Sequence, residues 1–254
     1  MRRFFLIVLI LSIAVSSFAA DTIRVMTYNM AVGLLADMNQ LGEYIRLVDA
    51  DIVALQEVDL RTYRPETPQQ AGKNQMAELG GTTDMLPLFG PVTPHPSGGY
   101  YGLGFLTEEP VYSVQIVHLP KVVDNDEPRA MLVATWKLFG RTITIANTHL
   151  SLSKSNRAAQ MRFIRKYMRK IGGVKLICGD FNSDYSEGLV KKIFRHWKDA
   201  LPYPCNTFPS SGPYAKYDWM LYQNACSIHV SEAVVDSACH LSDHLPCYID
   251  IVLQ

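Results

Sequence analysis

Four strand-like segments follow one another in the middle of the chain, with joins too short for helices to cross between them. They cover residues 101–106, 111–118, 131–139 and 142–148, and the join Phe139-Gly140-Arg141 is short enough for a hairpin. Parallel neighbours need crossover connections of a dozen or more residues, usually helical. The pattern therefore excludes a fold that simply alternates strands and helices.

Segments with helical and strand patterns lie on both sides of this block. Apolar residues recur at helical spacing in residues 37–48, where Met38, Leu41, Ile45 and Val48 share one face. Further helices are expected at 73–79, 155–170 and 186–194, and further strands at 23–30, 51–56, 174–178, 218–222, 228–235 and 245–252. Each half of the chain mixes strand and helix patterns in a similar way. This predicts an α/β fold in which two mixed β-sheets pack face to face with helices outside.

Residues 1–20 have the composition of a secretory signal peptide. Met1-Arg2-Arg3 is basic, residues 4–15 are apolar but shorter than the ~20 residues of a membrane span, and small residues precede residue 21. We expect cleavage near Ala19 or Ala20 and a secreted or periplasmic protein. The alternative is a buried N-terminal strand or helix, but no turn chemistry joins this segment to the strand expected at 23–30.

Residues 21–254 are expected to form one domain. They contain no repeat, no low-complexity tract and no linker that would divide them. No segment after residue 20 is apolar enough to span a bilayer, so the sequence does not predict an integral membrane protein.

The mature chain carries no excess of positive charge. Without Arg2 and Arg3, 22 basic residues face 24 acidic ones, a net charge of −2. This charge balance does not indicate strong electrostatic binding of nucleic acid. An enzyme that binds nucleic acid transiently, however, needs just a local surface of basic residues. The helix expected at 155–170 is rich in arginine and lysine, but its apolar residues recur at helical spacing. This favours a solvated outer face over a nucleic-acid patch.

The five cysteines are an odd number, and their spacing matches no zinc-binding pattern. Cys178 lies in an apolar run and is interpreted as a small buried core residue. In an exported protein one or two disulfides are open among Cys205, Cys226, Cys239 and Cys247, and the sequence does not choose their pairing.

Polar side chains stand at the edges of the predicted strands. Gly179-Asp180-Phe181-Asn182 follows the apolar run 174–178, and Ser242-Asp243-His244 precedes the last strand. Comparable positions are held by Asn29, Glu57, His149 and Asp218. One such residue alone is more simply a turn residue or a helix cap. Because strand ends in α/β sheets are where polar groups converge on a ligand, the whole set predicts a ligand site, and a catalytic phosphate site is the hypothesis to test.

In this order the polar strings resemble the endonuclease/exonuclease/phosphatase superfamily, which has the DNase I-like fold. The strings that carry the resemblance are Met26-Thr27-Tyr28-Asn29, Leu55-Gln56-Glu57-Val58, Tyr101-Gly102-Leu103-Gly104-Phe105-Leu106, Asn147-Thr148-His149-Leu150, Gly179-Asp180-Phe181-Asn182, Tyr217-Asp218-Trp219-Met220 and Ser242-Asp243-His244. The resemblance covers nearly all of the mature chain. It implies a four-layer α/β sandwich and a hydrolase of phosphate esters, of the phosphodiesterase or nuclease type, in which metal-activated water attacks phosphorus.

The resemblance implies a Mg²⁺ site, at which Mn²⁺ or Ca²⁺ are alternatives. Glu57 matches the main carboxylate ligand of the family, and Asn29 and Asp243 match positions at or next to the metal. Mg²⁺ keeps much of its water shell and needs one or two carboxylates, which suits a site with few acids from any one segment.

The resemblance also assigns catalytic roles. Asp180 and Asn182 match the pair that orients the attacking water, His244 the histidine that contacts the phosphate, and Asp218 the acid that hydrogen-bonds this histidine. His149 stands where relatives place a residue directed at the leaving group. The sequence does not decide which histidine is the general acid and which is the base.

Arg129 matches a position where relatives often place a phosphate-contacting arginine. The guanidinium fork suits phosphate oxygens. The alternative is a surface arginine at the entrance of a strand.

The identity of the substrate stays open at this point. A nucleic acid, a phospholipid head group and an inositol phosphate are all compatible with the same catalytic residues. Residues 86–101 are the nearest candidate for a segment that enters a membrane surface, and no protein partner is indicated. An inactive binding module or an interaction protein on the same fold is disfavoured, because neither needs Glu57, Asp180 and His244 together.

Overall fold

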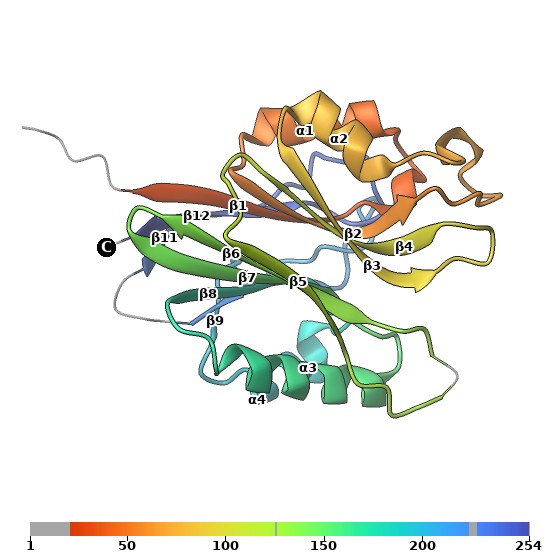
Figure 1. Cartoon of the computed structure of the whole chain (residues 1–254). Helices are drawn as coiled ribbons and strands as arrows, with labels where there is room; N and C mark the ends of the chain where they lie inside the picture. Colours follow the sequence, from red (N-terminus) through yellow and green to blue (C-terminus); the bar gives the residue numbers. More distant parts are fainter. Residues whose placement is uncertain (1–20, 125, 224–227, 254) are drawn as a thin grey trace, which may run out of the picture.

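Two six-stranded β-sheets lie face to face, and helices cover both outer faces (Figure 1). The computed structural model describes residues 21–124, 126–223 and 228–253. The first sheet runs in the order β11 (Ile228–Val235), β12 (Cys247–Leu253), β1 (Thr22–Asn29), β2 (Ile52–Leu60), β4 (Tyr100–Thr107) and β3 (Leu86–Pro94). The second runs in the order β5 (Ser113–His118), β6 (Ala130–Leu138), β7 (Arg141–His149), β8 (Val174–Asp180), β10 (Asp218–Tyr222) and β9 (Lys198–Asp199).

The helices form the two outer layers. Figure 1 shows α1 (Met38–Val48) and α2 (Gln75–Thr83) above the first sheet, and α3 (Lys154–Met168) and α4 (Leu189–Ile193) below the second. Short 3-10 helices lie at η1 (Ala31–Gly33), η2 (Pro68–Gln70) and η3 (Tyr185–Glu187). The predicted four-layer sandwich is confirmed.

Three apolar clusters hold the four layers together. The central cluster joins the facing sides of the two sheets, where Phe105 of β4 meets Trp136 of β6 edge to face with ring centroids 5.5 Å apart. The second cluster packs α1 and α2 on the first sheet, and the third packs α3 and α4 on the second. The central strands β1, β2, β4, β8 and β10 therefore bury both of their faces, which explains the nearly continuous apolar runs in the sequence, whereas the edge strands are partly exposed.

A parallel pair of strands lies inside each sheet. β1 runs parallel to β2, and β7 runs parallel to β8, while the remaining pairs are antiparallel. Carboxyl ends of parallel strands meet at one edge of a sheet, so each sheet brings two strand ends together there. The candidate site lies at this edge, where the start of β10 and the segments before β6 and β12 also contribute residues.

Strand β3 was not expected from the sequence. Residues 86–94 contain Pro87, Pro91 and Pro94, and a proline cannot donate a backbone hydrogen bond to a neighbouring strand. The structure places β3 at the edge of the first sheet, paired with β4 alone, where such residues are tolerated. Much of the candidate membrane-surface segment is therefore part of a sheet.

The helix expected at 186–194 is interrupted. Gly188 adopts a positive φ of 63°, which ends η3 and begins α4. Glycine reaches this conformation without the steric cost that a side chain imposes.

The cysteines that the structure describes do not form disulfides. Cys178, Cys239 and Cys247 are buried free thiols, and Cys205 is a half-buried one. The disulfides that the sequence left open are therefore not formed among Cys205, Cys239 and Cys247, and Cys226 lies outside the described residues.

The expected signal peptide lies outside the described residues as well. Within residues 21–253, apart from the gaps at 125 and 224–227, no helix has the length and apolar character needed to cross a membrane.

Candidate active site

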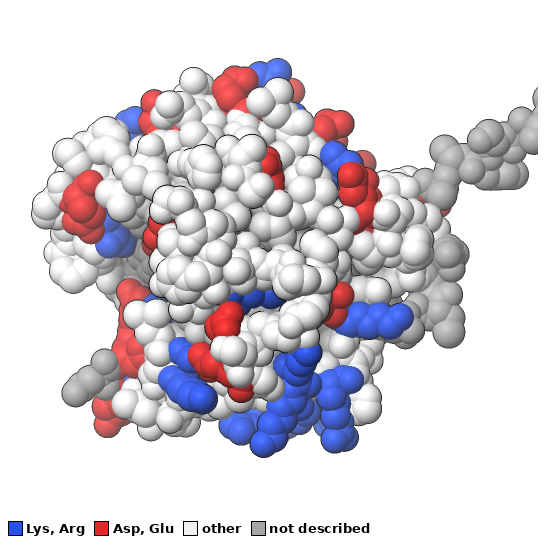
Figure 2. Space-filling model, turned by 180° about the vertical axis from the view of Figure 1, so that it is seen from behind, with Lys and Arg blue, Asp and Glu red and all other residues white. Residues whose placement is uncertain are grey.

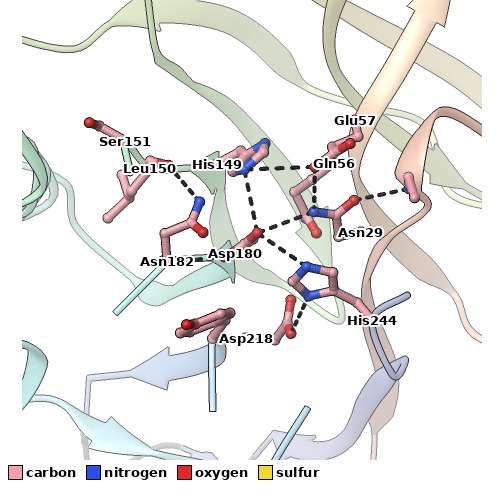
Figure 3. Close-up of polar contacts among 12 residues, drawn as sticks. Asn29, Gln56, Glu57, His149, Leu150, Ser151, Asp180, Asn182, Asp218 and His244 are labelled. Atoms are coloured by element: carbon pink, nitrogen blue, oxygen red, sulfur yellow. Dashed lines mark hydrogen bonds and ion pairs between the residues drawn. The ribbon is translucent and has the colours of Figure 1, made fainter. Parts of the chain in front are cut away.

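The residues predicted for the site come together at one edge of the sandwich (Figure 3). Asn29, His149 and Asp180 are the last residues of β1, β7 and β8, and Asp218 is the first residue of β10. Asp243 and His244 precede β12, and Arg129 precedes β6. One cleft of about 460 Å³ is lined by all of these residues except two, and by Glu57 and Asn182 as well. The two exceptions contact lining residues: Asn29 contacts Glu57, and Asp218 contacts His244.

Local backbone features position these strand ends. Glu57 has a positive φ of 55° in β2, at the point where its register with β4 shifts. Such a bulge re-aims a side chain out of the regular alternation. Gly179 has a φ of 128°, and a Cβ at this position would lie 2.0 Å from the carbonyl oxygen of Thr148 in β7. The glycine before Asp180 is therefore required for close pairing of β7 and β8.

Buried side chains anchor the two polar strings. Phe181 is fully buried and packs against Phe194 and Trp219, while Asp180 and Asn182 on either side of it turn to the cleft. The hydroxyl of Ser242 donates to the carbonyl oxygen of Asn29 at 2.7 Å, which ties the second string to the end of β1.

Asp180 lies at the centre of the polar cluster (Figure 3). Its Oδ2 is 3.1 Å from Nδ2 of Asn29, 3.4 Å from Nε2 of His149 and 3.6 Å from Nε2 of His244. Its Oδ1 accepts a hydrogen bond from the backbone N–H of Asn182 at 2.7 Å. Burial raises the pKa of Asp180 above its ordinary value, so this carboxylate binds a proton more readily than an exposed one.

Asn29 connects Asp180 with Glu57. Its Nδ2 also donates to Oε1 of Glu57 at 3.0 Å, and its Oδ1 accepts from the backbone N–H of Ala31 at 3.0 Å. Because both groups of the amide are used, Asn29 fixes the distance between two carboxylates. Burial raises the pKa of Glu57, and the negative charge of Asp243 adds to this effect.

His244 is paired with Asp218. Oδ2 of Asp218 lies 2.8 Å from Nδ1 of His244, and the ring of Phe208 packs on the imidazole with centroids 4.8 Å apart. Burial alone would lower the pKa of His244, but the charges of Asp218 and Asp180 outweigh it and raise this pKa to about 10. The imidazole is therefore positively charged at neutral pH.

His149 has a different partner. Its Nδ1 lies 3.1 Å from the hydroxyl of Tyr101, and its Nε2 lies 4.0 Å from Oε1 of Glu57. Burial lowers the pKa of His149 well below its ordinary value, and the positive charges of Arg129 and His244 lower it further. The two histidines thus differ in charge at neutral pH.

Arg129 is buried beside the cleft, with 7% of its side chain exposed. Its Nη2 lies 2.9 Å from Oε2 of Glu127, whereas its Nε and Nη1 are buried without a hydrogen-bond partner in the described structure. Unpaired buried N–H groups are rare and costly, so an anion in the cleft would supply the missing partners. The alternative of a surface arginine is wrong.

Sequence reasoning missed Tyr101, although it lies within one of the strings that resemble the family. Its contact with His149 joins β4 of one sheet to β7 of the other, and no local pattern indicates it. A second missed feature links the sheets below the site, where Nε2 of Gln56 donates to Oδ1 of Asn147 at 2.7 Å.

The donor set fits a hard divalent cation. Glu57 and Asp243 both line the cleft, and carboxylate oxygens are the ligands that Mg²⁺ takes from proteins. Among the residues that the structure describes, no three acidic, histidine or cysteine side chains form a ready-made metal-binding group. Mg²⁺ needs one or two carboxylates and keeps several waters, so the residues present are sufficient for it.

The two mixed sheets and their polar edge define an α/β sandwich of the DNase I-like class. The model of the endonuclease/exonuclease/phosphatase family matches residues 26–244, and the chain belongs to this family. The match begins in β1 and ends at His244.

Individual relatives extend this result. The "Uncharacterized protein YbhP" of Escherichia coli K12 is 24% identical over 248 residues, which cover 91% of this chain and 96% of that protein. An endonuclease/exonuclease/phosphatase from Beutenbergia cavernae superposes with a TM-score of 0.76 at 19% identity, covering 92% of this chain and 72% of that one. The mannosyl-6-phosphatase Bt3783 of Bacteroides thetaiotaomicron has a TM-score of 0.72 at 15% identity, covering 91% of this chain and all of that one. At these identities the two structures establish a common fold.

Proposed function

We propose that this protein is a Mg²⁺-dependent hydrolase of phosphate esters, in which an oriented water molecule attacks phosphorus. The main support is the position of Asp180, whose Oδ2 lies within 3.6 Å of the Asn29 amide and of the imidazoles of His149 and His244. A carboxylate, a charged histidine and a neutral histidine at one cleft are the groups that proton transfer to and from a phosphate ester requires.

Asp180 and Asn182 are assigned to the attacking water. The raised pKa of Asp180 suits a group that accepts a proton from water as the new bond to phosphorus forms. Nδ2 of Asn182 donates to the carbonyl oxygen of Leu150 at 2.8 Å, which holds this amide at the cleft wall.

His244 and Arg129 are assigned to the phosphoryl oxygens. Asp218 occupies Nδ1 of His244, so the cationic ring presents its Nε2–H to the cleft. The guanidinium of Arg129 offers two further donors. Preorganised donors directed at oxygens that gain negative charge are typically the largest contribution to such a reaction.

His149 is assigned to the leaving group. A phenol rather than a carboxylate holds its Nδ1. Burial, together with the positive charges of Arg129 and His244, lowers the pKa of this ring and so favours its neutral form. In its neutral form it donates a hydrogen bond to the departing oxygen.

Glu57 and Asp243 are proposed to hold Mg²⁺, with Asn29 orienting the Glu57 carboxylate. When bound, Mg²⁺ neutralises charge on the phosphoryl oxygens. Mn²⁺ and Ca²⁺ take the same oxygen ligands and are expected to substitute with altered rates.

A compact phosphate ester suits the cleft better than a nucleic acid strand. Glu66 and Glu127 line the cleft beside Arg64 and Arg129, and a strand would bring several phosphates against these acids. A phosphomonoester, such as the name of the mannosyl-6-phosphatase indicates for that relative, and a phospholipid head group remain the candidates to compare.

A substrate panel tests the proposal. Protein lacking residues 1–20 is incubated in Mg²⁺ with sugar phosphates, inositol phosphates, sphingomyelin, plasmid DNA, RNA and simple nitrophenyl phosphates, each also in EDTA. We expect hydrolysis of at least one ester in Mg²⁺ and none in EDTA. Binding of a phosphate ester with no turnover in any metal would instead support an inactive binding module.

We also propose that residues 1–20 direct export. The basic start and apolar stretch support this. Mass spectrometry of the protein recovered outside the cytoplasm should give an N-terminus at residue 20 or 21, and an intact Met1 there would contradict the proposal.

A further inference from the structure

A basic pocket of about 550 Å³ lies on the outer helix layer, apart from the cleft. We call it the α3 pocket. None of its lining residues also lines the candidate active site. Its walls come from α3, from the end of α4 and the segment after it, and from the residue that follows β10, and they include Arg162, Arg165, Lys166, Arg169, Arg195 and Trp197.

Positive charge is concentrated around this pocket. Residues 151–179 contain eight lysines and arginines, residues 188–198 contain four more, and neither segment contains an acid. Half of the 24 basic residues therefore lie in two short segments of a chain whose formal net charge is zero. Figure 2 shows blue side chains gathered along the lower part of the molecule, the side on which Figure 1 places α3 and α4.

The cations that line the pocket have no acidic partner among the described residues. In the part of the chain that the structure describes, none of the five forms an ion pair with an aspartate or glutamate. By contrast, Arg157 on the same helix is buried and paired with Glu187 at 2.9 Å. Like charges held together repel one another, and a bound anion would relieve this repulsion.

The pocket is also built on a fixed frame. Nη1 of Arg165 donates to the carbonyl oxygen of Ile193 at 3.0 Å, which ties α3 to the end of α4. Trp197 forms an aromatic part of the wall and is half-buried. The cations therefore surround a concave volume rather than project singly into solvent.

We propose that the α3 pocket is a second, noncatalytic binding site for a compact ligand that carries two or more phosphate groups. Arginine forks match phosphate oxygens, and four arginines and one lysine provide more positive charge than one phosphate needs. The volume lies in the range of small-ligand sites. A single-stranded nucleic acid instead requires a continuous groove with successive aromatic platforms, whereas this pocket has one tryptophan in its wall.

Calorimetric titration with inositol hexakisphosphate tests the proposal. The protein without residues 1–20 is titrated in EDTA at constant ionic strength, which removes metal from the cleft and holds charge screening constant. The test variant is R162Q/K166Q/R169Q, whose three side chains are exposed on the described surface. The matched control is R46Q/K121Q/K137Q, which removes the same charge from other exposed positions.

We expect one site per chain in the wild type and the control. Binding to the test variant should be at least about tenfold weaker, because three of the five cations that would contact the phosphates are removed. Vesicles of phosphatidylcholine with phosphatidylinositol 4,5-bisphosphate distinguish the source. If the vesicles bind the wild type and not the test variant, the ligand is a lipid head group. If inositol hexakisphosphate binds in the titration but the vesicles do not bind the protein, the ligand is a free molecule.

Three outcomes would overturn the proposal. The first is no saturable binding, and the second is equal affinity in the wild type and the test variant. The third is that an oligothymidylate of twenty nucleotides binds more tightly than inositol hexakisphosphate and that the test variant loses this binding. That result would make the surface a nucleic-acid site instead. Thermal unfolding of both variants checks that their folds are intact.

Discussion

Oδ2 of Asp218 lies 2.8 Å from Nδ1 of His244, and both side chains are almost completely buried. β10 begins at Asp218 and pairs with β8 so that Asp218 is opposite Asp180. One strand pairing therefore fixes both the partner of His244 and the carboxylate that His244 Nε2 faces. The charged form of His244 depends on this pairing.

Asp218→Asn should lower turnover by about 10²- to 10⁴-fold, in the range for loss of an orienting acid or a general acid. The substitution keeps the shape of the side chain but removes the charge that raises the pKa of His244. In metal-free protein, NMR titration of His244 should show a lower pKa than in the wild type. Unchanged turnover would show that the pairing is structural alone. Asp199→Asn, which removes a half-buried acid paired with Lys216, is the control.

Glu57→Gln should weaken the response to Mg²⁺. The amide keeps a hydrogen-bonding oxygen near Asn29 but loses the charge that a divalent cation requires. The Mg²⁺ concentration for half-maximal activity should rise at least about tenfold, since even partners of metal ligands affect affinity by 10- to 100-fold. An unchanged Mg²⁺ response would mean that Glu57 does not bind the metal. Glu66→Gln, on the same cleft, is the control.

Arg129→Ala should reduce kcat/KM by about 10- to 100-fold, because hydrogen bonds to charged groups contribute about 1.5–3 kcal/mol. The buried Nε and Nη1 groups have no partner in the described protein, so their role is expected to appear when substrate binds. Arg61→Ala removes an exposed arginine near β2 and should leave kcat/KM within about twofold. Equal effects of the two substitutions would contradict the assignment.

The acid sensitivity of folding should depend on Asp250. Nε and Nη2 of Arg24 donate to its two carboxylate oxygens at 2.7 and 2.8 Å, and these hydrogen bonds hold the pKa of Asp250 below its ordinary value. A lowered folded-state pKa adds stability above the unfolded pKa of about 3.9, and this stability is lost as pH falls through the folded value.

Asp250→Asn should therefore lower the Tm at pH 7 by about 2–4 °C, equivalent to ~1 kcal/mol, and should have little effect near pH 2. Thermal unfolding across this pH range measures the difference. Glu43→Gln, which removes an exposed partner of Arg46, is the control. A Tm difference that does not change with pH would contradict the prediction.

Much of the sandwich could be predicted from apolar periodicity. The strands at 218–222 and 228–235 agree with the structure, and the helix expected at 37–48 begins after Asp37, which caps it. β3 was missed because prolines conceal an edge strand, whose pairing depends on β4. The interruption at Gly188 was missed because glycine is tolerated inside a helix unless tertiary packing requires a positive φ.

The members of the site could be predicted, but their connections could not. Strand-end position singles out Asn29 and Asp180, whereas the use of the Asn29 amide to join two carboxylates depends on how the two sheets face each other. Tyr101 reaches His149 across the sandwich for the same reason. In the α3 pocket, Arg195 meets α3 from a segment about 30 residues away, which helical periodicity does not detect.

Hydrolysis of the best ester in the panel by wild type, Asp180→Asn and His244→Ala protein, each in Mg²⁺ and in EDTA, tests the central claim most directly. The wild type should be active in Mg²⁺, inactive in EDTA and active again when excess Mg²⁺ is restored. Both variants should fold and turn over about 10²- to 10⁴-fold more slowly in Mg²⁺. Wild-type activity that persists in EDTA, or variants as active as the wild type, would contradict the claim that these residues form a metal-dependent phosphoesterase site.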